Sequence, residues 1–374
     1  MLSRILHRES PPVGIEIGDA GVRMLQLDRT RSGYSVRAHG ASTLRPSSEP
    51  LSPARLEEIG NAIREHVDSG RFSARECVLG LGGAGLRVRS VRQPRMPRAE
   101  ADKALRIEAA DRLGLNEPRG VQIGWIRAGD VRHGEEIREE VIVVGCERDL
   151  VERIVEMVSG AGLRPVAVEP SFCALARALG REHRDDFNED FVRLVVEVGP
   201  HASTVLVLRG ADTTFYKRLA IGGRDFDRVA AERLGLDPAT VVDLRRQRID
   251  AACDIGVDAP PAKIDRAIFD AVRPLVHELA EEVALCLRYY TVTFCSKRPS
   301  HALVVGEDAG EPGLVESLAG AMNLEGSLGK PLEGVGLGPF ERAFASDAFR
   351  AQWGAALGLA VRRNPERGAR RDAA

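Results

Sequence analysis

Two glutamates in the sequence stand where a carboxylate can do chemistry. Glu16 lies near the end of an apolar run at residues 13–17, and Glu197 has the same place in residues 194–198. A glycine follows each glutamate two residues later. A buried carboxylate is costly unless it lies beside a cation, whereas a glycine lets backbone amides approach an anion closely. Two such hairpins facing each other predict a polyphosphate site, with Glu16 and Glu197 coordinating magnesium directly or through water.

Each hairpin alone has a simpler interpretation, because short glycine-containing motifs often match by chance. Either one reads as an ordinary β-hairpin whose glutamate happens to sit at the end of a strand. The repetition of the whole pattern in both halves of the chain favours a binding site.

The elements around these hairpins alternate between short strands and amphipathic helices, which predicts an α/β protein. Residues 13–27 read as two strands around a glycine-rich turn, and residues 192–221 read as three successive strands. A long helix is predicted at residues 263–295, with Pro274 as a kink or a break. Apolar side chains at helical spacing predict shorter helices at residues 55–67, 98–113, 149–161 and 347–361.

Two other patterns have structural interpretations. Residues 80–85 match the G-x-G-x-x-G dinucleotide fingerprint, but residues 86–91 alternate apolar and polar side chains like a strand, whereas the fingerprint opens a helix. We therefore predict a hairpin turn there. Glu139 and Glu140 resemble a pair of hydrolytic acids, but they lie in the charged stretch 127–140, which predicts a solvated loop and strand edge.

Composition excludes several classes of function. The 374 residues carry 53 Lys and Arg against 55 Asp and Glu, so we expect no nucleic-acid partner. Aromatic residues make up only 5%, which argues against a base-stacking surface. No apolar stretch approaches the ~18 residues of a membrane-spanning helix or forms a signal peptide, so we expect a cytoplasmic protein. The 6 cysteines form no C-x-x-C pair, which argues against a disulfide framework or a zinc site.

Taken together, these motifs resemble the phosphate and adenosine motifs of actin-like ATPases. The order is a strand-acid-x-Gly hairpin, a second such hairpin followed by Gly222 and Gly223, and a glycine turn after the strand at residues 301–305. Within that superfamily the chain resembles the PilM family of type IV pilus assembly proteins, close to the cell-division protein FtsA. The resemblance covers residues 13–362 and is strongest at residues 13–27, 148–152, 161–170, 287–290 and 355–360.

The resemblance implies an actin-like ATPase fold. This is an α/β fold with two lobes, each built on a mixed β-sheet flanked by helices, and here with a small inserted α+β subdomain. We expect an N-terminal segment at 1–12, lobe 1 at 13–44 and 163–190, the insertion at 45–162, lobe 2 at 191–361 and a basic disordered tail at 362–374.

The resemblance also places residues around ATP and Mg²⁺, with Glu16 and Glu197 as the metal-binding acids. In the first phosphate loop they are Glu16, Gly18, Asp19, Ala20, Gly21 and Arg23. In the second they are Glu197, Gly199, His201, Ala202 and Ser203. Gly222 and Gly223 are expected near the ribose and phosphates, and Asp243 and Arg245 match a Glu-x-Lys pair that contacts the nucleoside in relatives. The adenosine motif maps to Gly306, Glu307, Asp308 and Ala309.

The adenosine motif departs from the family pattern. Relatives carry three glycines and an alanine there, whereas this chain has Glu307 and Asp308 as the second and third residues. Two added carboxylates repel a triphosphate, and their side chains fill space where a nucleotide would meet bare backbone. Glu16 and Glu197 replace aspartates of the family, which moves the magnesium. No residue is identified as a water-activating base, since His201 is a candidate by position only, so the catalytic residues stay unassigned.

Two functions remain open at this stage. The first is a scaffold at the cytoplasmic face of the inner membrane that serves type IV pilus assembly or a related competence or secretion system. The resemblance implies that such a scaffold binds the cytoplasmic N-terminal peptide of an inner-membrane protein, PilN, contacts other pilus platform proteins and reaches the membrane through its partners. The second is an active ATPase that hydrolyses ATP between the two lobes. Glu307 and Asp308 favour the scaffold.

Overall fold

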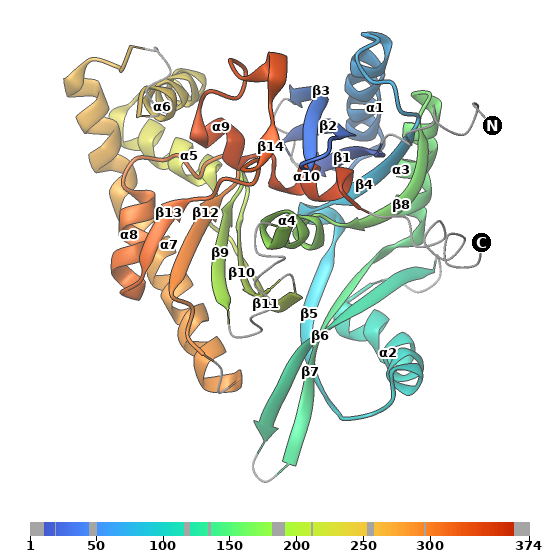
Figure 1. The fold of residues 1–374 in the computed structure, drawn as a ribbon. Coiled ribbons are helices and arrows are strands. Elements are labelled where there is room, and N and C mark those ends of the chain that lie inside the picture. The colour runs from blue at the N-terminus through green and yellow to red at the C-terminus, as the bar shows by residue number, and fades with distance from the viewer. Residues whose placement is uncertain are drawn as a thin grey trace.

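The computed structural model describes residues 11–18, 20–44, 51–115, 120–133, 136–181, 191–210, 212–252, 258–294 and 297–362. In these ranges the chain forms three β-sheets, of six, five and three strands (Figure 1). None of the helices described there is both long enough and apolar enough to cross a membrane. The predicted disordered tail, apart from residue 362, and most of the predicted N-terminal segment lie outside the described residues.

The six-stranded sheet has the order β14-β3-β2-β1-β4-β8. The first three strands along the chain are antiparallel neighbours, and β4 and β8 run parallel to β1. Helices α1 (Pro53–Asp68) and α3 (Arg148–Gly160) bury their apolar faces on one side of this sheet. The strands are β1 (Val13–Gly18), β2 (Gly21–Arg29), β3 (Tyr34–Thr43), β4 (Glu76–Leu81), β8 (Arg164–Pro170) and β14 (Val335–Gly336).

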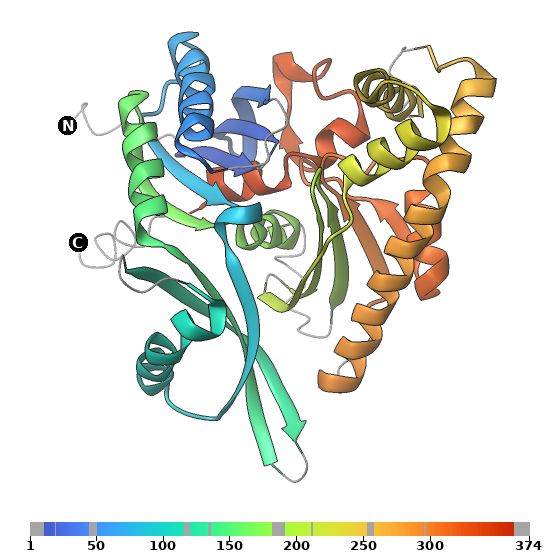
Figure 2. The same ribbon diagram turned by 180° about the vertical axis from the view of Figure 1, so that it is seen from behind.

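The five-stranded sheet has the order β11-β10-β9-β12-β13. Its strands are β9 (Val192–Val198), β10 (Ser203–Arg209), β11 (Asp212–Leu219), β12 (His301–Val305) and β13 (Glu325–Leu328). One face is covered by α5 (Gly223–Leu234), α7 (Ala262–Phe294) and α8 (Leu314–Met322). Helix α6 (Pro238–Ala252) packs beside α5. The predicted long helix is confirmed as α7, which continues through Pro274 and runs along the outer edge of the molecule in Figure 2.

The three-stranded sheet has the order β5-β7-β6 and extends away from the two larger sheets (Figures 1 and 2). Its strands are β5 (Arg87–Pro94), β6 (Val121–His133) and β7 (Glu136–Glu147). Helix α2 (Arg98–Leu113), which matches its predicted bounds, packs on one face through Leu105 and Leu113. This sheet and α2 form the small α+β subdomain.

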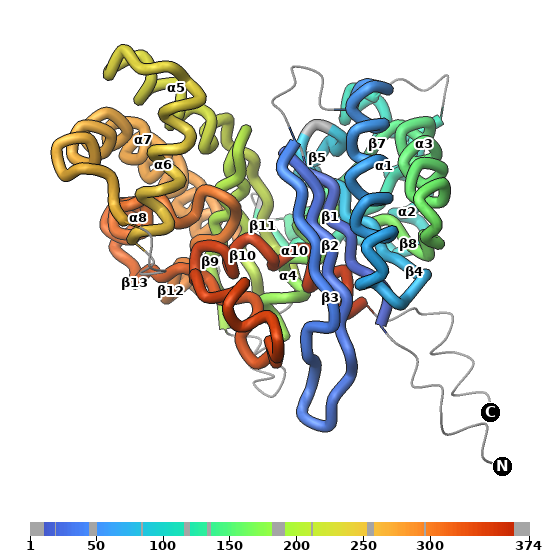
Figure 3. The backbone as a smooth tube through the Cα atoms, turned by 90° about the horizontal axis from the view of Figure 1, so that it is seen from above, coloured from blue at the N-terminus to red at the C-terminus, as the bar shows by residue number. Residues whose placement is uncertain are grey.

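Helices α4 (Ser171–Gly180) and α10 (Gly354–Ala360) pack against each other between the two larger sheets, as Figure 3 shows from above. Both approach their neighbours closely. A Cβ atom on Gly358 would lie 1.8 Å from the carbonyl oxygen of Ala174. One on Gly14 would lie 2.3 Å from that of Ala356. Glycine at these positions therefore lets α10 pack closely on α4 and on β1. The short helix α9 (Asp347–Ala351) precedes α10.

The expected limits of the insertion and of lobe 2 differ from the limits of the sheets. The three-stranded sheet begins at Arg87 and ends at Glu147, because β4, α1 and α3 belong with the six-stranded sheet although they fall in the expected insertion at 45–162. Likewise β14 and α10 pack on the six-stranded sheet, although residues 191–361 are expected in lobe 2. Parallel partners are joined by long connections, so a local sequence pattern does not indicate which sheet a strand enters.

Two local predictions are wrong. Strands β4 and β5 form no hairpin with each other, since β4 pairs with β1 and β8 whereas β5 pairs with β7. Residues 82–85, three of which are glycines, instead connect β4 of the six-stranded sheet with β5 of the three-stranded sheet. Glu139 and Glu140 are buried in β7 and do not lie on a solvated edge. Their burial is tolerated because Arg127 pairs with Glu139 and Arg92 with Glu140.

Candidate functional site

The alternation of side chains along a strand places Glu16 and Glu197 between the two larger sheets. In β1 the odd-numbered residues enter the core under α1 and α3, so Glu16 faces the other side, where α10 packs. In β9 the even-numbered residues face α7, so Glu197 faces the side of the sheet on which α4 lies. Both hairpins predicted from the sequence are present, as β1–β2 and β9–β10.

Arg23 links the two lobes. It is the cross-strand partner of Glu16 in the β1–β2 hairpin, and its Nη1 lies 3.9 Å from Glu16 Oε2. Its Nη2 donates a hydrogen bond to the carboxylate of Glu307, which follows β12 in the other lobe. The same nitrogen lies 3.3 Å from Oε1 of Gln352. We call Glu16, Arg23, Glu197, Glu307 and Gln352 the interlobe cluster.

The interlobe cluster contains three carboxylates and one guanidinium. The pKa values of two of these carboxyls are raised. Burial raises the pKa of Glu16 to about 7, while Arg23 opposes the rise and the charges of Glu197 and Glu307 add to it. Burial also raises the pKa of Glu197 to about 7, against the influence of Arg23. One guanidinium therefore does not compensate the three carboxylates near it.

The stability of the protein should depend on pH through these two carboxyls. Both have an ordinary pKa of 4.5 in the unfolded chain and about 7 in the folded protein. The folded protein therefore binds more protons between these values, so the free energy of unfolding should fall as pH rises from 4.5 to 7. The slope is at most about 1.4 kcal/mol per pH unit for each carboxyl.

Urea denaturation at pH 5, 6 and 7 measures this slope. The variant Glu16→Gln should give a flatter slope than the wild type, because it removes one titrating carboxyl. Glu57→Gln, which changes an exposed glutamate on α1, is the control and should leave the slope unchanged. Equal slopes for the wild type and Glu16→Gln would contradict the assignment of the titration to this cluster.

In the second predicted phosphate loop and in the segment that contains Gly222 and Gly223, several backbone amides already donate hydrogen bonds to nearby residues of the same lobe. Gly223 N donates to Gly199 O at 3.0 Å, and Gly199 N donates to Ala202 O at 3.1 Å. The side chain of Asp225 accepts a hydrogen bond from Gly222 N, capping α5. A Cβ atom on Gly222 would lie 2.5 Å from Ala202 N, so glycine is required there.

The predicted adenosine motif forms a tight turn after β12. Gly306 has φ +105°, a conformation that favours glycine, and its amide donates to Ala351 O at 3.1 Å. The carboxylate of Asp308 lies directly against Gly223, where an added Cβ would come within 2.0 Å of Asp308 Oδ2. Burial raises the pKa of Asp308 to about 6, with Arg245 opposing the rise. The side chain of Asp308 thus fills the space beside the predicted phosphate and ribose contact.

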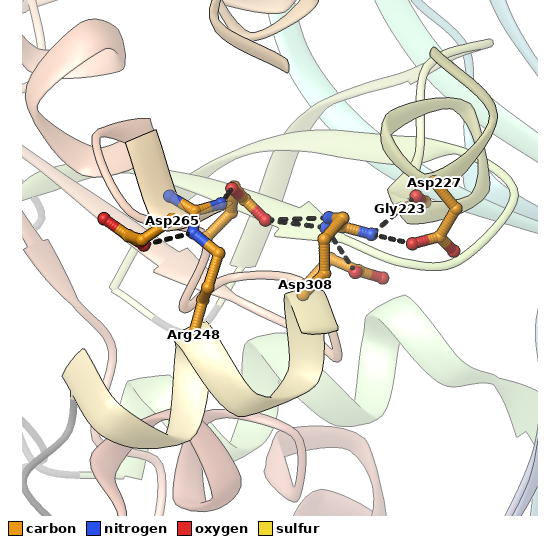
Figure 4. A network of polar contacts seen from close by, with 7 residues as sticks. Gly223, Asp227, Arg248, Asp265 and Asp308 are labelled. Carbon is orange, nitrogen blue, oxygen red and sulfur yellow. Dashed lines mark hydrogen bonds and ion pairs between the residues drawn. The ribbon is translucent and has the colours of Figure 1, made fainter. Parts of the chain in front are cut away.

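Arg245 holds Asp308 in this position through an extended network (Figure 4). Its Nη2 donates to Asp308 at 3.2 Å and to Glu311 at 2.7 Å, and its Nη1 donates to the carbonyl oxygen of Gly223 at 3.0 Å and to Asp227. Arg248, one turn further along α6, donates to Glu311 at 2.9 Å and to Asp265 at 2.6 Å. We call Asp227, Arg245, Arg248, Asp265, Asp308 and Glu311 the arginine network.

The structure brings most predicted site residues together, from both lobes. Gly18 and Gly21 pair across the end of the β1–β2 hairpin, beside the buried Ala20. Ser203 is buried at the start of β10, and Ala309 is buried next to Asp308. His201 is partly buried in the second loop. Asp243 differs, because it lies on the exposed side of α6. Asp19 lies outside the described residues.

Five residues of these clusters are not predicted from the sequence: Asp227, Arg248, Asp265, Glu311 and Gln352. Two of them carried a usable signal. Arg248 comes three residues after Arg245 and Glu311 three residues after Asp308, a spacing that places each pair on one side of a helix or turn. Gln352 carried none, because α9 and α10 bring it to the cluster from the far end of the chain.

One carboxylate oxygen here could bind a cation, but the described residues form no metal centre and do not fit a nucleoside triphosphate. Glu16 Oε2 is buried and receives no hydrogen bond from the described residues, as befits an oxygen that could bind a cation. Within the same residues, however, no group of three metal-binding side chains is present. A triphosphate would meet the carboxylates of Glu307 and Asp308, and the cation nearest to it, Arg23, already pairs with Glu307.

Comparison with known proteins identifies the family. The family model described as type IV pilus assembly protein PilM matches residues 14–364. The chain belongs to this family. In the solved structure of a PilM-PilN type IV pilus biogenesis complex, a chain aligns with 94% of this one and 98% of its own length, at 23% identity and a TM-score of 0.75.

A second solved structure shares the fold across nearly the whole chain. The ethanolamine utilization protein EutJ from Carboxydothermus hydrogenoformans aligns with 96% of this chain and 93% of its own length, at 15% identity and a TM-score of 0.53. The prediction of an actin-like ATPase fold is therefore confirmed. As in the prediction, both large sheets are mixed and flanked by helices.

Proposed function

We propose that this chain is a cytoplasmic scaffold of type IV pilus assembly, or of a related competence or secretion system, whose lobes are joined by its own ion pairs instead of by ATP. It lies at the inner face of the inner membrane and binds the cytoplasmic N-terminal peptide of a PilN-like membrane protein. Contacts with other platform proteins keep it at the membrane. Membership of the family and the likeness to a PilM-PilN complex support this role.

The observation that carries the proposal is the ion pair between Arg23 and Glu307. It joins the two lobes at the place where the sequence predicts the phosphates and magnesium. A nucleotide that bridged two lobes there would need cations and amides from both sides. Here Arg23 already pairs with Glu307 across the lobes, the Gly199 amide donates within the second predicted phosphate loop, and the Gly223 amide donates to that loop. A scaffold that presents one constant surface to a peptide needs no nucleotide cycle.

Peptide binding without nucleotide tests this role. We expect the purified chain to bind a synthetic N-terminal peptide of the PilN-like protein from the same organism, with the same affinity in EDTA as in Mg-ATP. Fluorescence anisotropy of the labelled peptide measures both affinities, and a scrambled peptide of the same composition is the control. Binding that requires Mg-ATP would favour the alternative function, a nucleotide-driven ATPase. Absence of binding in both buffers would refute the scaffold role.

A further inference from the structure

One edge of the six-stranded sheet carries a group of exposed arginines. The parallel strands β1, β4 and β8 all begin at this edge, and the chain turns there between β2 and β3. This turn projects from the sheet in Figure 3. Six arginines on the strands and loops of this edge are exposed: Arg29, Arg31, Arg37, Arg71, Arg75 and Arg164. We call these six residues the basic edge.

Hydrogen bonds join the loops of the basic edge into one continuous surface. The connection from α1 to β4 is tied to β2 through Gln26, whose Oε1 accepts from the amides of Ser73 at 2.9 Å and Ala74 at 3.3 Å. Arg75 reaches the connection from α3 to β8, because its Nη1 donates to the carbonyl oxygen of Gly162 at 3.4 Å. Four spacings of ~4.8 Å between neighbouring strands separate β3 from β8, so the basic edge spans roughly 20 Å.

Most of the positive charge on the basic edge is not neutralised by acids. Arg37 pairs with Asp28, and Arg164 pairs with Glu76. The other four arginines form no ion pair with any acid among the described residues. Positive charge stays in excess even when the two exposed acids in the last turn of α1 are counted. Such a surface attracts anions.

Both ends of the described chain lie near the basic edge. Pro11 leads into β1, and Arg362 follows α10, which packs on β1. The two elements meet near the start of β1, since a Cβ atom on Gly14 would lie 2.6 Å from the backbone nitrogen of Ala360. Residues 1–10 contain two arginines against one acid, and residues 363–374 contain four arginines against two acids. Both segments therefore start from the neighbourhood of the basic edge and carry further positive charge.

The first of these segments also has apolar residues in an amphipathic pattern. Ile5 and Leu6 come three and four residues after Leu2, a spacing that places all three on one face of a helix. Arg4 and Arg8 stand beside them in the sequence. This pattern suits the boundary between the headgroups and the acyl chains of a membrane. Since a single short anchor binds a bilayer only weakly, a basic surface next to it supplies the second signal that attachment requires.

We infer that the basic edge is a contact surface for an anionic lipid bilayer, and that Leu2, Ile5 and Leu6 enter the bilayer beside it. A guanidinium donates two parallel hydrogen bonds to a phosphate, so arginine suits lipid headgroups. The apolar residues among the arginines favour lipid over nucleic acid, which offers no apolar phase to receive them. The inference goes beyond the proposed function, in which partner proteins hold the chain at the membrane, and does not depend on it.

Sedimentation with lipid vesicles that contain no protein tests this inference. We expect the full chain to bind vesicles of equal parts phosphatidylglycerol and phosphatidylcholine at least tenfold more tightly than vesicles of phosphatidylcholine alone. Added salt should weaken the binding, because it screens the attraction between arginines and headgroups. The double variant Arg71→Glu/Arg75→Glu should bind the anionic vesicles about tenfold more weakly or less. Ile5→Asp should also weaken binding, because it places a charge on the apolar face.

A second double variant, Arg246→Glu/Arg273→Glu, is the matched control. It changes the net charge by the same amount on two exposed arginines of α6 and α7, and should bind vesicles like the wild type. Circular dichroism must show that each variant is folded. A wild type without preference for anionic vesicles would overturn the inference, as would equal losses in the two double variants. Wild-type binding by Ile5→Asp would refute the part assigned to the first segment. Double-stranded DNA that binds as tightly as the anionic vesicles would make the basic edge a nucleic-acid surface instead.

Discussion

Replacing Arg245 with methionine should lower the free energy of unfolding by about 3–5 kcal/mol, the usual effect of removing one partner from a buried ion pair. The Arg245 side chain is only 3% exposed and is bonded to Asp227, Asp308 and Glu311. Methionine fills similar space but donates no hydrogen bond. Asp308 then lies buried without its cation, and Glu311, which is 1% exposed, retains Arg248 alone.

Urea denaturation at pH 7 measures this loss. Arg266→Met is the matched control, because Arg266 also pairs with an acid, Asp270, but its side chain is 70% exposed. Exposed pairs of this kind contribute roughly 0.5 kcal/mol or less. If Arg245→Met and Arg266→Met destabilised the protein equally, the arginine network would not hold the lobe together in the way we describe.

Most helices and the two acid-bearing hairpins are the parts of this fold that the sequence predicts, because their signals are local. The hairpin at Glu16 and its echo at Glu197 rest on a few adjacent residues, and α2 and α7 show their apolar faces in their own spacing. The entry of β4 into the six-stranded sheet is different, since its neighbours β1 and β8 come from distant parts of the chain. The packing of α10 against β1 could not be predicted for the same reason, because the two elements come from opposite ends of the chain.

The same difference between local and long-range contacts applies to the candidate site. Arg23 and Glu16 could be paired from the sequence because they face each other across one hairpin. The partnership of Arg23 with Glu307 could not, because it depends on how the two lobes meet. The sequence identifies Glu307 and Asp308 as additional negative charge, but it does not show that Arg23 lies beside Glu307 and Arg245 beside Asp308. In the structure both acids of the altered nucleotide motif take part in ion pairs, although Arg23 and Arg245 are each shared with other carboxylates.

The second large expected effect is a gain of affinity for Mg-ATP in a variant that lacks the Glu307 and Asp308 side chains. Changing Glu307 and Asp308 together to glycine should raise the affinity for Mg-ATP about tenfold or more, which corresponds to about 1.4 kcal/mol. The change removes two carboxylates from the predicted path of the phosphates, clears the space against Gly223 and releases Arg23 to pair with a phosphate. The variant should still fold, because Arg245 keeps Asp227 and Glu311.

Isothermal titration calorimetry with Mg-ATP on the wild type and the variants separates the effect of the lost charge from the effect of the lost side-chain volume. The wild type should show little or no binding. Glu307→Gln removes one charge but leaves a side chain in place, so its gain should be smaller than that of the double glycine variant. Micromolar binding by the wild type that is lost in Glu16→Ala would instead mean that the ATPase alternative is right. Glu307 and a bound triphosphate would compete for Arg23. The wild type can therefore either keep the Arg23–Glu307 ion pair or bind Mg-ATP through Arg23, but not both at once.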